Sequence, residues 1–335
     1  MQYVAIFNPE HDLCLANGDP NFVPPASALE FGTDCRDVMQ MLYAGDETTP
    51  VTRCVGGGEL YDSRFRWEPD WIPLPWGWNR TVRRLLLRRG CRPETMPAEA
   101  QLDAWRRLSD RRTAMEAARR VCEVLDVPCE VVTAASVADV ASQVEEGERV
   151  LKAPLSGSGR GLRMVRHPLT PHDRAWVQAT VAQQGVVMVE RRHRVVQDFA
   201  LEFVVRRGMV HFVGCSLFET SGGVYAGNRL LSDEDIVQLL GRAMPRLRID
   251  DVRRTVASWL TAHVATLYEG PLGVDMFLYD DGAGVQLNPL VEINLRHTMG
   301  MVAHRLAATR AEWYGRRFAV RFDAGGRPRY RLSIE

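Results

Sequence analysis

One lysine stands at the end of an apolar run, directly before a loop rich in serine and glycine. Lysine and arginine together number 42, and Lys152 is the only lysine among them. The apolar run 149–153 carries it into the loop 156–161. A compact ammonium charge beside flexible backbone N–H groups suits a polyphosphate. The arginine guanidinium, by contrast, is rigid and planar. We therefore predict a phosphate-binding loop. The alternative is a strand and turn whose lysine has no chemical role.

The order of residues around Lys152 separates this loop from the two common nucleotide-binding patterns. A P-loop ends in Gly-Lys-Ser/Thr, but here the lysine precedes the glycines. The dinucleotide fingerprint requires G-x-G-x-x-G before a helix, whereas Gly157, Gly159 and Gly161 follow G-x-G-x-G. Residues 162–166 then alternate like a strand. Strand, glycine-rich loop and strand together predict a hairpin flap over phosphates.

A second group of residues interrupts two apolar strands near the carboxyl end. Asp275 is the one acid in the run 273–277, and Glu292 and Asn294 lie two apart in the run 290–295. Residues two apart on a strand share a face, so the three side chains converge if the strands pair. Two buried carboxylates need a cation between them, and oxygen ligands of this kind suit Mg²⁺. The alternative is a polar sheet edge that faces solvent. Arg296 shares this face and could stabilise charge on a transferred phosphoryl group.

Composition places the chain among ordinary globular proteins. Its 335 residues predict about two or three domains. The formal net charge of zero gives no sign of a nucleic-acid surface, and no apolar run is long enough for a membrane span. The first strand lacks a basic leader, and the seven scattered cysteines favour free thiols. We expect a cytoplasmic protein without nucleic-acid or membrane partners.

Hydrophobic periodicity predicts strands alternating with helices, a pattern typical of an α/β protein. Further predicted elements are a strand at 3–7, an irregular packed loop at 67–78, and helices at 26–42, 251–268 and 299–314. The polar loop 8–12 follows the first strand, where ligands often bind, although ordinary turn chemistry would explain it equally well. The glycine-rich stretch 219–229 is predicted to be a mobile lid that carries Arg229.

In their order and spacing these motifs resemble the ATP-grasp superfamily over roughly residues 100–310. The resemblance rests on Lys152 with its flap, then Val189-Glu190-Arg191, then Asp275, and finally Glu292-Ile293-Asn294. It implies an N-terminal α/β domain followed by an ATP-grasp fold of two α+β subdomains that clasp the nucleotide. The implied boundaries are 1–100 for the N-terminal domain, 101–190 for the small subdomain with the flap, and 191–335 for the subdomain with the magnesium site.

The resemblance also implies roles for single residues. ATP would be bound by Arg111, Lys152, Ser156, Gly157, Ser158, Gly159, Val189, Glu190, Arg191, His193 and Asp198. Arg111 or Arg112 is the nearest match to a second phosphate lysine of the family. Asp275, Glu292 and Asn294 match the Mg²⁺ ligands, and Lys152, Arg296 and Arg229 are the catalytic candidates. The substrate-binding candidates are Asn8, Glu10, His11, Gly300 and His304.

The expected activity is ATP-dependent ligation of a carboxylate, such as an amino acid or small peptide, to an amine through an acylphosphate. ATP and Mg²⁺ are the expected cofactors, small-molecule carboxylates and amines are the expected partners, and a homodimer is left open. Two alternatives remain at this point: an ATP-grasp kinase, or a nucleotide-binding regulatory protein with a degenerate site. Gly273 stands where D-Ala–D-Ala ligases carry an arginine, which weakens any claim to that particular activity.

Overall fold

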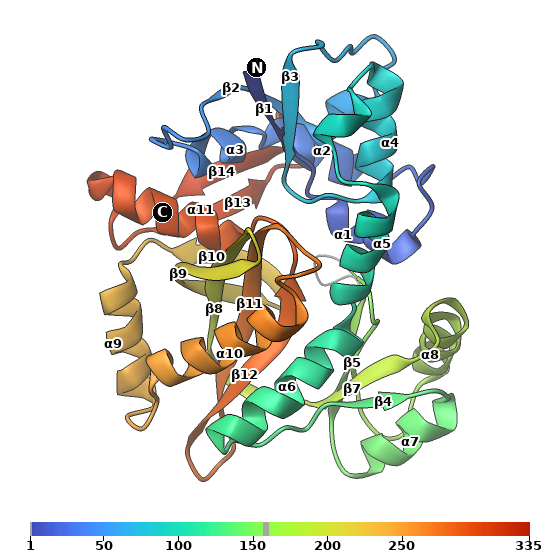
Figure 1. Ribbon diagram of the computed structural model, residues 1–335. Helices are drawn as coiled ribbons and strands as arrows, with labels where there is room; N and C mark the ends of the chain where they lie inside the picture. Colours follow the sequence, from blue (N-terminus) through green and yellow to red (C-terminus); the bar gives the residue numbers. More distant parts are fainter. Residues whose placement is uncertain (1, 157–160) are drawn as a thin grey trace.

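A computed structural model describes residues 2–156 and 161–335 of the chain. Three β-sheets, each with its own helices, make up this part of the molecule (Figure 1). The predicted mixed α/β class is confirmed. Gly157, Ser158 and Gly159, with Arg160, lie outside the described residues. No helix of the described parts combines the length and the apolar character needed to cross a membrane.

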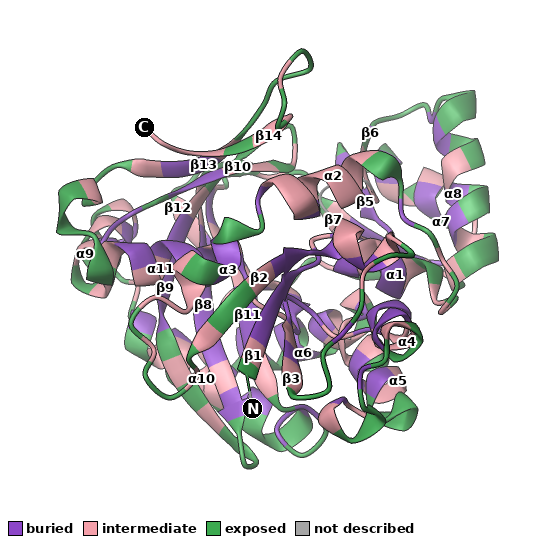
Figure 2. Cartoon of the chain, turned by 90° about the horizontal axis from the view of Figure 1, so that it is seen from above, coloured by how far each residue is buried: buried purple, intermediate pink, exposed green. Residues whose placement is uncertain are grey.

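The N-terminal sheet is parallel, with the strand order β2-β1-β3. Its strands are β1 (Gln2–Phe7), β2 (Val51–Gly56) and β3 (Trp71–Pro75). The helices of this region are α1 (His11–Asn17), α2 (Ala26–Asp34), α3 (Asp37–Leu42), α4 (Arg80–Arg89) and α5 (Glu99–Leu108). The four residues from Val4 to Phe7 are fully buried, as the apolar first run predicts (Figure 2).

Two predictions for the N-terminal region are wrong. The stretch 67–78 contains β3 and is not wholly irregular. Its prolines are tolerated because β3 is an edge strand, where a missing N–H need not break a ladder. The single helix expected at 26–42 is divided between α2 and α3. At the end of α2, the Asp34 carboxylate accepts the backbone N–H groups of Arg329 and Tyr330 at 2.8 and 3.0 Å. Local periodicity cannot predict this contact, because its partners lie near the carboxyl end of the chain.

The small sheet has the order β4-β7-β5-β6, and all its pairs are antiparallel. Its strands are β4 (Val132–Ala134), β5 (Arg149–Lys152), β6 (Leu162–Val165) and β7 (Val187–Arg191). Helices α7 (Val137–Glu145) and α8 (Pro171–Gln184) pack with them around a separate apolar cluster. β5 and β6 pair with Lys152 opposite Leu162, so the two strands that flank the glycine-rich loop form the predicted hairpin.

The large sheet has the order β12-β11-β8-β9-β10-β13-β14. Its strands are β8 (Arg194–Arg206), β9 (Met209–Ser221), β10 (Val224–Arg229), β11 (Gly270–Asp280), β12 (Val285–Asn294), β13 (Arg317–Phe322) and β14 (Tyr330–Ile334). The remaining helices are α6 (Arg111–Leu125), α9 (Asp233–Ala243), α10 (Ile249–His263) and α11 (Met299–Thr309). The helices predicted at 251–268 and 299–314 are thus present but end earlier than expected.

The expected lid at 219–229 is instead part of a β-hairpin. β9 and β10 pair across Gly222 and Gly223, whose φ angles are 60° and 81°. Both values lie in the left-handed region, which glycine enters at no steric cost. The glycines that suggested a long mobile loop therefore form a tight turn, and most of the segment is strand.

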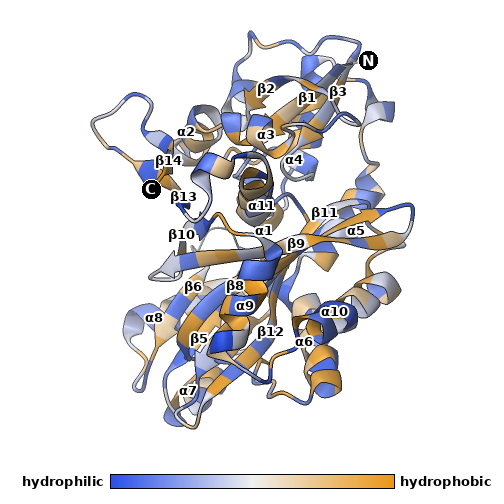
Figure 3. Ribbon diagram, turned by 90° about the vertical axis from the view of Figure 1, so that its left-hand side faces the viewer, coloured by the Kyte–Doolittle hydropathy of each residue, from blue (hydrophilic) through white to orange (hydrophobic). Residues whose placement is uncertain are grey.

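The two faces of the large sheet differ in chemistry because side chains alternate along each strand. In β8, Phe199, Leu201 and Phe203 enter the main apolar core with α6, α9 and α10. Asp198 and Glu202 lie on the opposite face. Figure 3 shows the apolar residues of the strands in orange and the polar positions between them in blue.

The carboxyl end of the chain packs against the N-terminal sheet. Phe7 of β1 and Met39 of α3 share a buried cluster with Leu306 of α11 and Phe318 of β13. The first and last elements are therefore held together by one apolar core. This packing positions the segment between β12 and α11 beside the end of β1.

Gly300 of α11 has no room for a side chain, whereas Gly241 of α9 faces open space. A Cβ at Gly300 would overlap the Glu202 carboxyl and the Ser216 side chain, but one at Gly241 meets nothing within 4 Å. Alanine is intrinsically better than glycine in a helix by roughly 0.5–1 kcal/mol. We expect Gly241→Ala to be neutral or stabilising and Gly300→Ala to destabilise by about 1–3 kcal/mol. Urea unfolding of the two matched variants measures the difference, and equal midpoints would contradict this packing.

Candidate functional site

The predicted metal ligands lie on the polar face of the large sheet, on the neighbouring strands β11 and β12. Asp275 of β11 lies opposite Glu292 of β12, and Gly273 lies opposite Asn294. The predicted pairing of these two strands is therefore present. On the other side of β11, Phe277 lies opposite Asp198 of β8. Asp198, predicted to meet the ribose, thus shares a face with the three predicted metal ligands.

The three predicted ligands form a small group of oxygen donors. The Asp275 carboxylate accepts a hydrogen bond from the Asn294 amide at 3.1 Å. Burial, followed by the nearby Glu292 charge, raises the pKa of Asp275 to about 7. Like charges directly opposite each other in a sheet repel, and a cation between them removes that cost. Two carboxylates and an amide oxygen suit a Mg²⁺ ion that keeps waters and phosphate oxygens. Among the described residues, no group of three or more His, Cys, Asp or Glu side chains is arranged to hold a metal ion, and the predicted site itself offers two carboxylates and one amide.

Arg111, the first residue of α6, connects this face to the base of the flap. Its guanidinium donates to the Glu292 carboxylate at 2.8 Å, and to the Ala153 carbonyl and Ser156 hydroxyl at 2.7 Å each. Arg112 instead pairs with Asp110, the residue that caps α6. Of the two arginines left open by the sequence, only Arg111 points toward the carboxylate face.

Lys152 lies at the end of β5, and its side chain is almost fully buried. Its ammonium group forms an ion pair with Glu190 of β7 at 2.6 Å. Asp198 is close enough that the Lys152 charge opposes the rise that burial produces in its pKa. The neighbouring Val189 is a buried residue of the small-sheet core. Lys152, Glu190 and Asp198 are therefore brought together, whereas the Val189 side chain points away from them.

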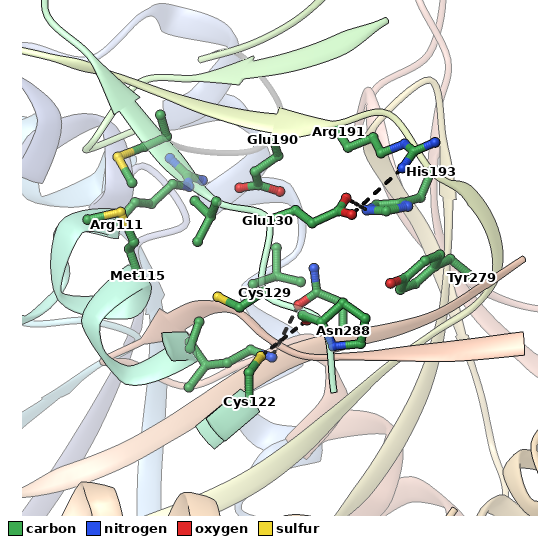
Figure 4. Close-up of a pocket in the computed structure, with 16 residues that line it drawn as sticks. Arg111, Met115, Cys122, Cys129, Glu130, Glu190, Arg191, His193, Tyr279 and Asn288 are labelled. Carbon is green, nitrogen blue, oxygen red and sulfur yellow. Dashed lines mark hydrogen bonds and ion pairs between the residues drawn. The ribbon is translucent and has the colours of Figure 1, made fainter. Parts of the chain in front are cut away.

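A cavity of about 560 Å³, open to solvent, lies between α6, the small sheet and the end of β12, and we call it the first cavity (Figure 4). The His193 ring packs on Tyr279 with ring centroids 3.9 Å apart. The Glu130 carboxylate lies 3.6 Å from the His193 ring nitrogen and 3.7 Å from the Arg191 guanidinium. The lining of the first cavity includes four predicted residues, Arg111, Glu190, Arg191 and His193. It also includes Cys122, Cys129, Glu130, Tyr279 and Asn288.

The last five of these lining residues are absent from the sequence prediction. Asn288 interrupts the predicted strand 285–295, so the same signal that identified Glu292 could have identified it. Glu130 and the two cysteines give no comparable signal. Cys122 reaches the cavity from α6, and Cys129 and Glu130 reach it because the chain reverses after α6 and returns along the edge of the small sheet.

A smaller cavity of about 280 Å³, which we call the second cavity, begins at the metal-ligand face. Glu292 and Asn294 line it together with His11, Asp12 and Ser156. It therefore joins residues of α1 to the predicted metal site. These parts of the chain are almost three hundred positions apart in sequence.

Asp12 engages Arg296 directly. The Arg296 guanidinium donates to the Asp12 carboxylate at 2.9 Å and to the Asn294 amide oxygen at 3.0 Å. Burial alone would raise the pKa of Asp12, but the Arg296 charge and hydrogen bond, together with the charges of His11 and Arg111, lower it overall. Arg296, predicted to stabilise a transferred phosphoryl group, is thus already paired. Its place in this structure is between Asp12 and Asn294.

His11 lines the second cavity as a neutral ring. Burial lowers its pKa to about 4, so it carries no charge near neutral pH. The Asn79 side-chain oxygen accepts the backbone N–H of Val82, which leaves the Asn79 amide nitrogen as a donor to His11 Nδ1 at 3.1 Å. In that tautomer, His11 Nε2 carries the proton.

Ten of the predicted residues that the structure describes line neither cavity. Lys152, Val189, Asp198, Asp275 and Arg296 are described above, and the other five follow. Arg229 is exposed on β10, and His304 lies 3.5 Å from the Asp233 carboxylate. Asn8 holds the backbone of Gly77, to which its amide donates at 2.9 Å. Gly300 packs on Glu202, as described above. Glu10 is buried directly against Gly57. The structure accordingly does not bring these five residues to the predicted site.

Glu202 is a buried acid that the sequence analysis did not single out. Its two carboxyl oxygens accept hydrogen bonds from Ser216 at 3.0 Å and from Thr298 at 2.9 Å. Burial raises its pKa to about 7. Thr298 also caps α11, because its hydroxyl accepts the Met301 N–H. Glu202 therefore fixes the start of α11 against the metal-ligand face. As the one acid in the apolar run 199–205 of β8, it shows the same signal as Asp275.

No family model matches the sequence, and a search of curated proteins finds no match either. Many solved structures resemble the chain, among them the following three. One is a protein from Archaeoglobus fulgidus, provisionally assigned to the ATP-grasp superfamily, with 13% identity, a TM-score of 0.48 and coverage of 100% of this chain and 99% of that chain. Another is N5-carboxyaminoimidazole synthetase from Staphylococcus aureus complexed with ADP, with 12% identity, a TM-score of 0.47 and coverage of 92% and 77%.

The third is D-alanyl-alanine synthetase A from Vibrio cholerae, with 13% identity, a TM-score of 0.45 and coverage of 94% of each chain. The Archaeoglobus fulgidus protein is assigned to the same superfamily that the sequence motifs resemble. At these identities and TM-scores the likenesses assign no reaction to this chain.

The burial of Glu10 predicts how stability depends on pH. Burial raises the pKa of its carboxyl from 4.5 to about 8. Between these values the folded protein holds a proton that the unfolded chain has released, so the free energy of unfolding falls as pH rises. Glu10→Gln removes this titration. Between pH 5 and pH 8 the variant should lose about 2–4 kcal/mol less stability than the wild type.

The matched control for Glu10→Gln is Glu145→Gln, because Glu145 is exposed on α7 and should follow the wild-type pH profile. Urea unfolding at several pH values measures both variants. Parallel profiles for Glu10→Gln and wild type would show that the Glu10 carboxyl is not held protonated in the fold.

Proposed function

We propose that the chain is an ATP-grasp enzyme that ligates a small-molecule carboxylate to an amine through an acylphosphate. One observation supports this most directly. Asp275, Glu292 and Asn294 share a sheet face with Asp198, and the cationic groups of Lys152 and Arg111 lie on the elements opposite that face. Cations on one wall and oxygen ligands on the other suit a triphosphate and its metal ion.

The order of residues along the face suggests how the nucleotide lies. The first cavity offers an aromatic pair, His193 and Tyr279, for a base. Asp198 follows as an acceptor for ribose hydroxyls, and the phosphates would then lie between Lys152 and Asp275. Because Arg111 already touches the flap base and Glu292, it is placed to contact the same phosphates.

Asp275, Glu292 and Asn294 would hold Mg²⁺, whose charge would neutralise the phosphate oxygens. The raised pKa of Asp275 fits this role, because the crowded carboxylates gain stability when a cation joins them. Arg111 supplies part of that positive charge through Glu292. All other work of the site is positioning and charge stabilisation by residues of the chain.

The second cavity would hold the two substrates to be joined. A carboxylate oxygen attacks the γ-phosphate of ATP, ADP departs, and the acylphosphate that forms is attacked by an amine with release of phosphate. The amine must lose a proton in this second step. Asp12 and Glu292 line the second cavity as carboxylates suited to an ammonium group, and the His11 Nε2–H is suited to a carboxylate. This pair of features favours ligation over simple phosphorylation.

The chemistry is tested by ADP release with panels of carboxylates and amines, supplied alone and in pairs. A ligase releases ADP and phosphate with a condensed product, whereas a kinase leaves a stable phosphorylated product. We expect turnover to need both substrates and Asp275→Asn to reduce it by about 10²-fold or more. Asp250→Asn, an exposed change on α10, is the control and should retain turnover. Turnover that no carboxylate–amine pair stimulates would contradict the ligase assignment.

The single lysine allows a direct test of nucleotide position. Pyridoxal 5′-phosphate followed by borohydride labels amines, so only Lys152 and the N-terminal amine can react in this chain. MgATP should protect Lys152, because its ammonium group would then face the phosphates. Peptide mapping measures the label at each position, and the N-terminal amine serves as the internal control. Equal labelling of Lys152 with and without saturating MgATP would place the nucleotide elsewhere.

A further inference from the structure

Two cysteines lie on the wall of the first cavity, away from the predicted phosphate and metal residues. Cys122 is buried on the last turns of α6, and Cys129 is exposed after the helix has ended. Figure 4 shows both side chains on the same side of the cavity, next to Glu130 and Asn288. The proposed ligase reaction uses neither thiol.

The end of α6 brings the two cysteines together. The Cys122 carbonyl accepts the backbone N–H groups of Asp126 and Val127, and Asp126 adopts a left-handed φ of 53°. This is the usual way in which a helix stops and the chain reverses. The Cys122 thiol then reaches the Pro128 carbonyl at 3.4 Å, directly before Cys129. Chain reversal over seven positions thus places the second thiol beside the first.

The thiols differ in reactivity as well as exposure. The neighbouring thiol is the largest influence on the pKa of each group. This influence lowers the pKa of Cys129 to about 6, and it raises the pKa of Cys122. The lowered pKa favours the thiolate form of the exposed Cys129, and thiolates are the attacking species in thiol–disulfide exchange. A buried thiol stands next to it.

We propose that Cys122 and Cys129 form a redox-modifiable pair. Their disulfide would close the part of the first cavity proposed to hold the nucleotide base. The oxidant is a small-molecule disulfide such as oxidised glutathione. The Cys129 thiolate attacks one of its sulfur atoms, which forms a mixed disulfide and expels one glutathione thiolate. The Cys122 sulfur then attacks the Cys129 sulfur, and the second glutathione leaves as the Cys122 proton passes to solvent or to the leaving thiolate. Two thiols are oxidised and one disulfide is reduced.

The expected consequence is weaker nucleotide binding, and this second half of the inference rests on the proposed function. A disulfide requires sulfur atoms about 2.05 Å apart, so Cys129 must move toward α6. Glu130 is the next residue and contacts Arg191 and His193 across the cavity. Displacement of Glu130 would disturb the groups that face the base. We expect about tenfold weaker nucleotide binding, equivalent to about 1.4 kcal/mol.

Peptide mapping of the full-length protein tests the disulfide without any nucleotide. Cleavage after arginine yields one peptide, 121–149, that contains Cys122 and Cys129 and none of the other five cysteines. After oxidised glutathione and then alkylation, this peptide should carry an internal disulfide and no alkyl group. After reduction it should carry two alkyl groups. Glutathione retained on Cys129, or two alkyl groups after oxidation, would overturn the pairing.

Variants link the disulfide to nucleotide binding. Fluorescent ATP-analogue titrations compare oxidised and reduced samples of wild type, Cys129→Ser and Cys54→Ser. In wild type and in Cys54→Ser, the oxidised sample should bind the analogue about tenfold more weakly than the reduced sample. Cys54 lies in β2, in the N-terminal sheet. In Cys129→Ser, the two samples should bind equally. An internal disulfide with an unchanged affinity ratio would overturn the inhibitory half. If reduced wild type binds no nucleotide, the proposed function fails, while peptide mapping still decides whether the pair forms.

Discussion

Two carboxylates face each other across one strand pair. Several neighbouring groups offset the repulsion between their charges. Asp275 and Glu292 occupy opposite positions of β11 and β12 on a largely buried face. Such a pair needs positive charge nearby, and Arg111 supplies it from the first residue of α6. Asn294 adds a hydrogen bond to Asp275, and Glu202 fixes the start of α11 beside them. The divalent cation of the proposed reaction would complete this charge balance.

Helix α6 connects the two ends of the first cavity. Near its N-terminus, Arg111 contacts Ser156 at the start of the glycine-rich loop and Glu292 on the carboxylate face. Near its C-terminus, Cys122 lines the part of the cavity proposed to hold the nucleotide base. One side of the helix packs into the main core through Ala114, Ala117 and Val121. The same rigid element therefore positions both the arginine proposed to contact phosphate and the proposed cysteine pair. Because that side is packed in the core, a change at either end is not readily absorbed by the helix.

The second cavity depends on the two ends of the chain meeting. α11 and β13 share an apolar cluster with β1 and α3, and this packing brings Arg296 next to Asp12. The ion pair joins the residue after the metal-ligand strand to α1. His11 stays neutral because it is buried and hydrogen-bonded to Asn79. The proposed site for acceptor substrates thus requires the N-terminal region, although the residues proposed to bind the nucleotide all come from later in the chain.

The sequence by itself determined the features carried by local pattern. The lone Lys152 before a glycine-rich loop identified the hairpin flap, and single polar residues in apolar strands identified Asp275, Glu292 and Asn294. Glu202 and Asn288 show the same signal and could have been found. These predictions succeed because alternation along a strand decides which side chains share a face. The roles assigned to these residues remain predictions.

Only the tertiary structure decided which distant groups meet. It paired Arg296 with Asp12, selected Arg111 over Arg112, and brought Glu130 and the cysteine pair to the first cavity. It also kept Gly300, His304 and Arg229 away from both cavities and turned the expected lid into a hairpin. Local periodicity carries no information about these outcomes, because each is set by how separate sheets and helices pack against one another.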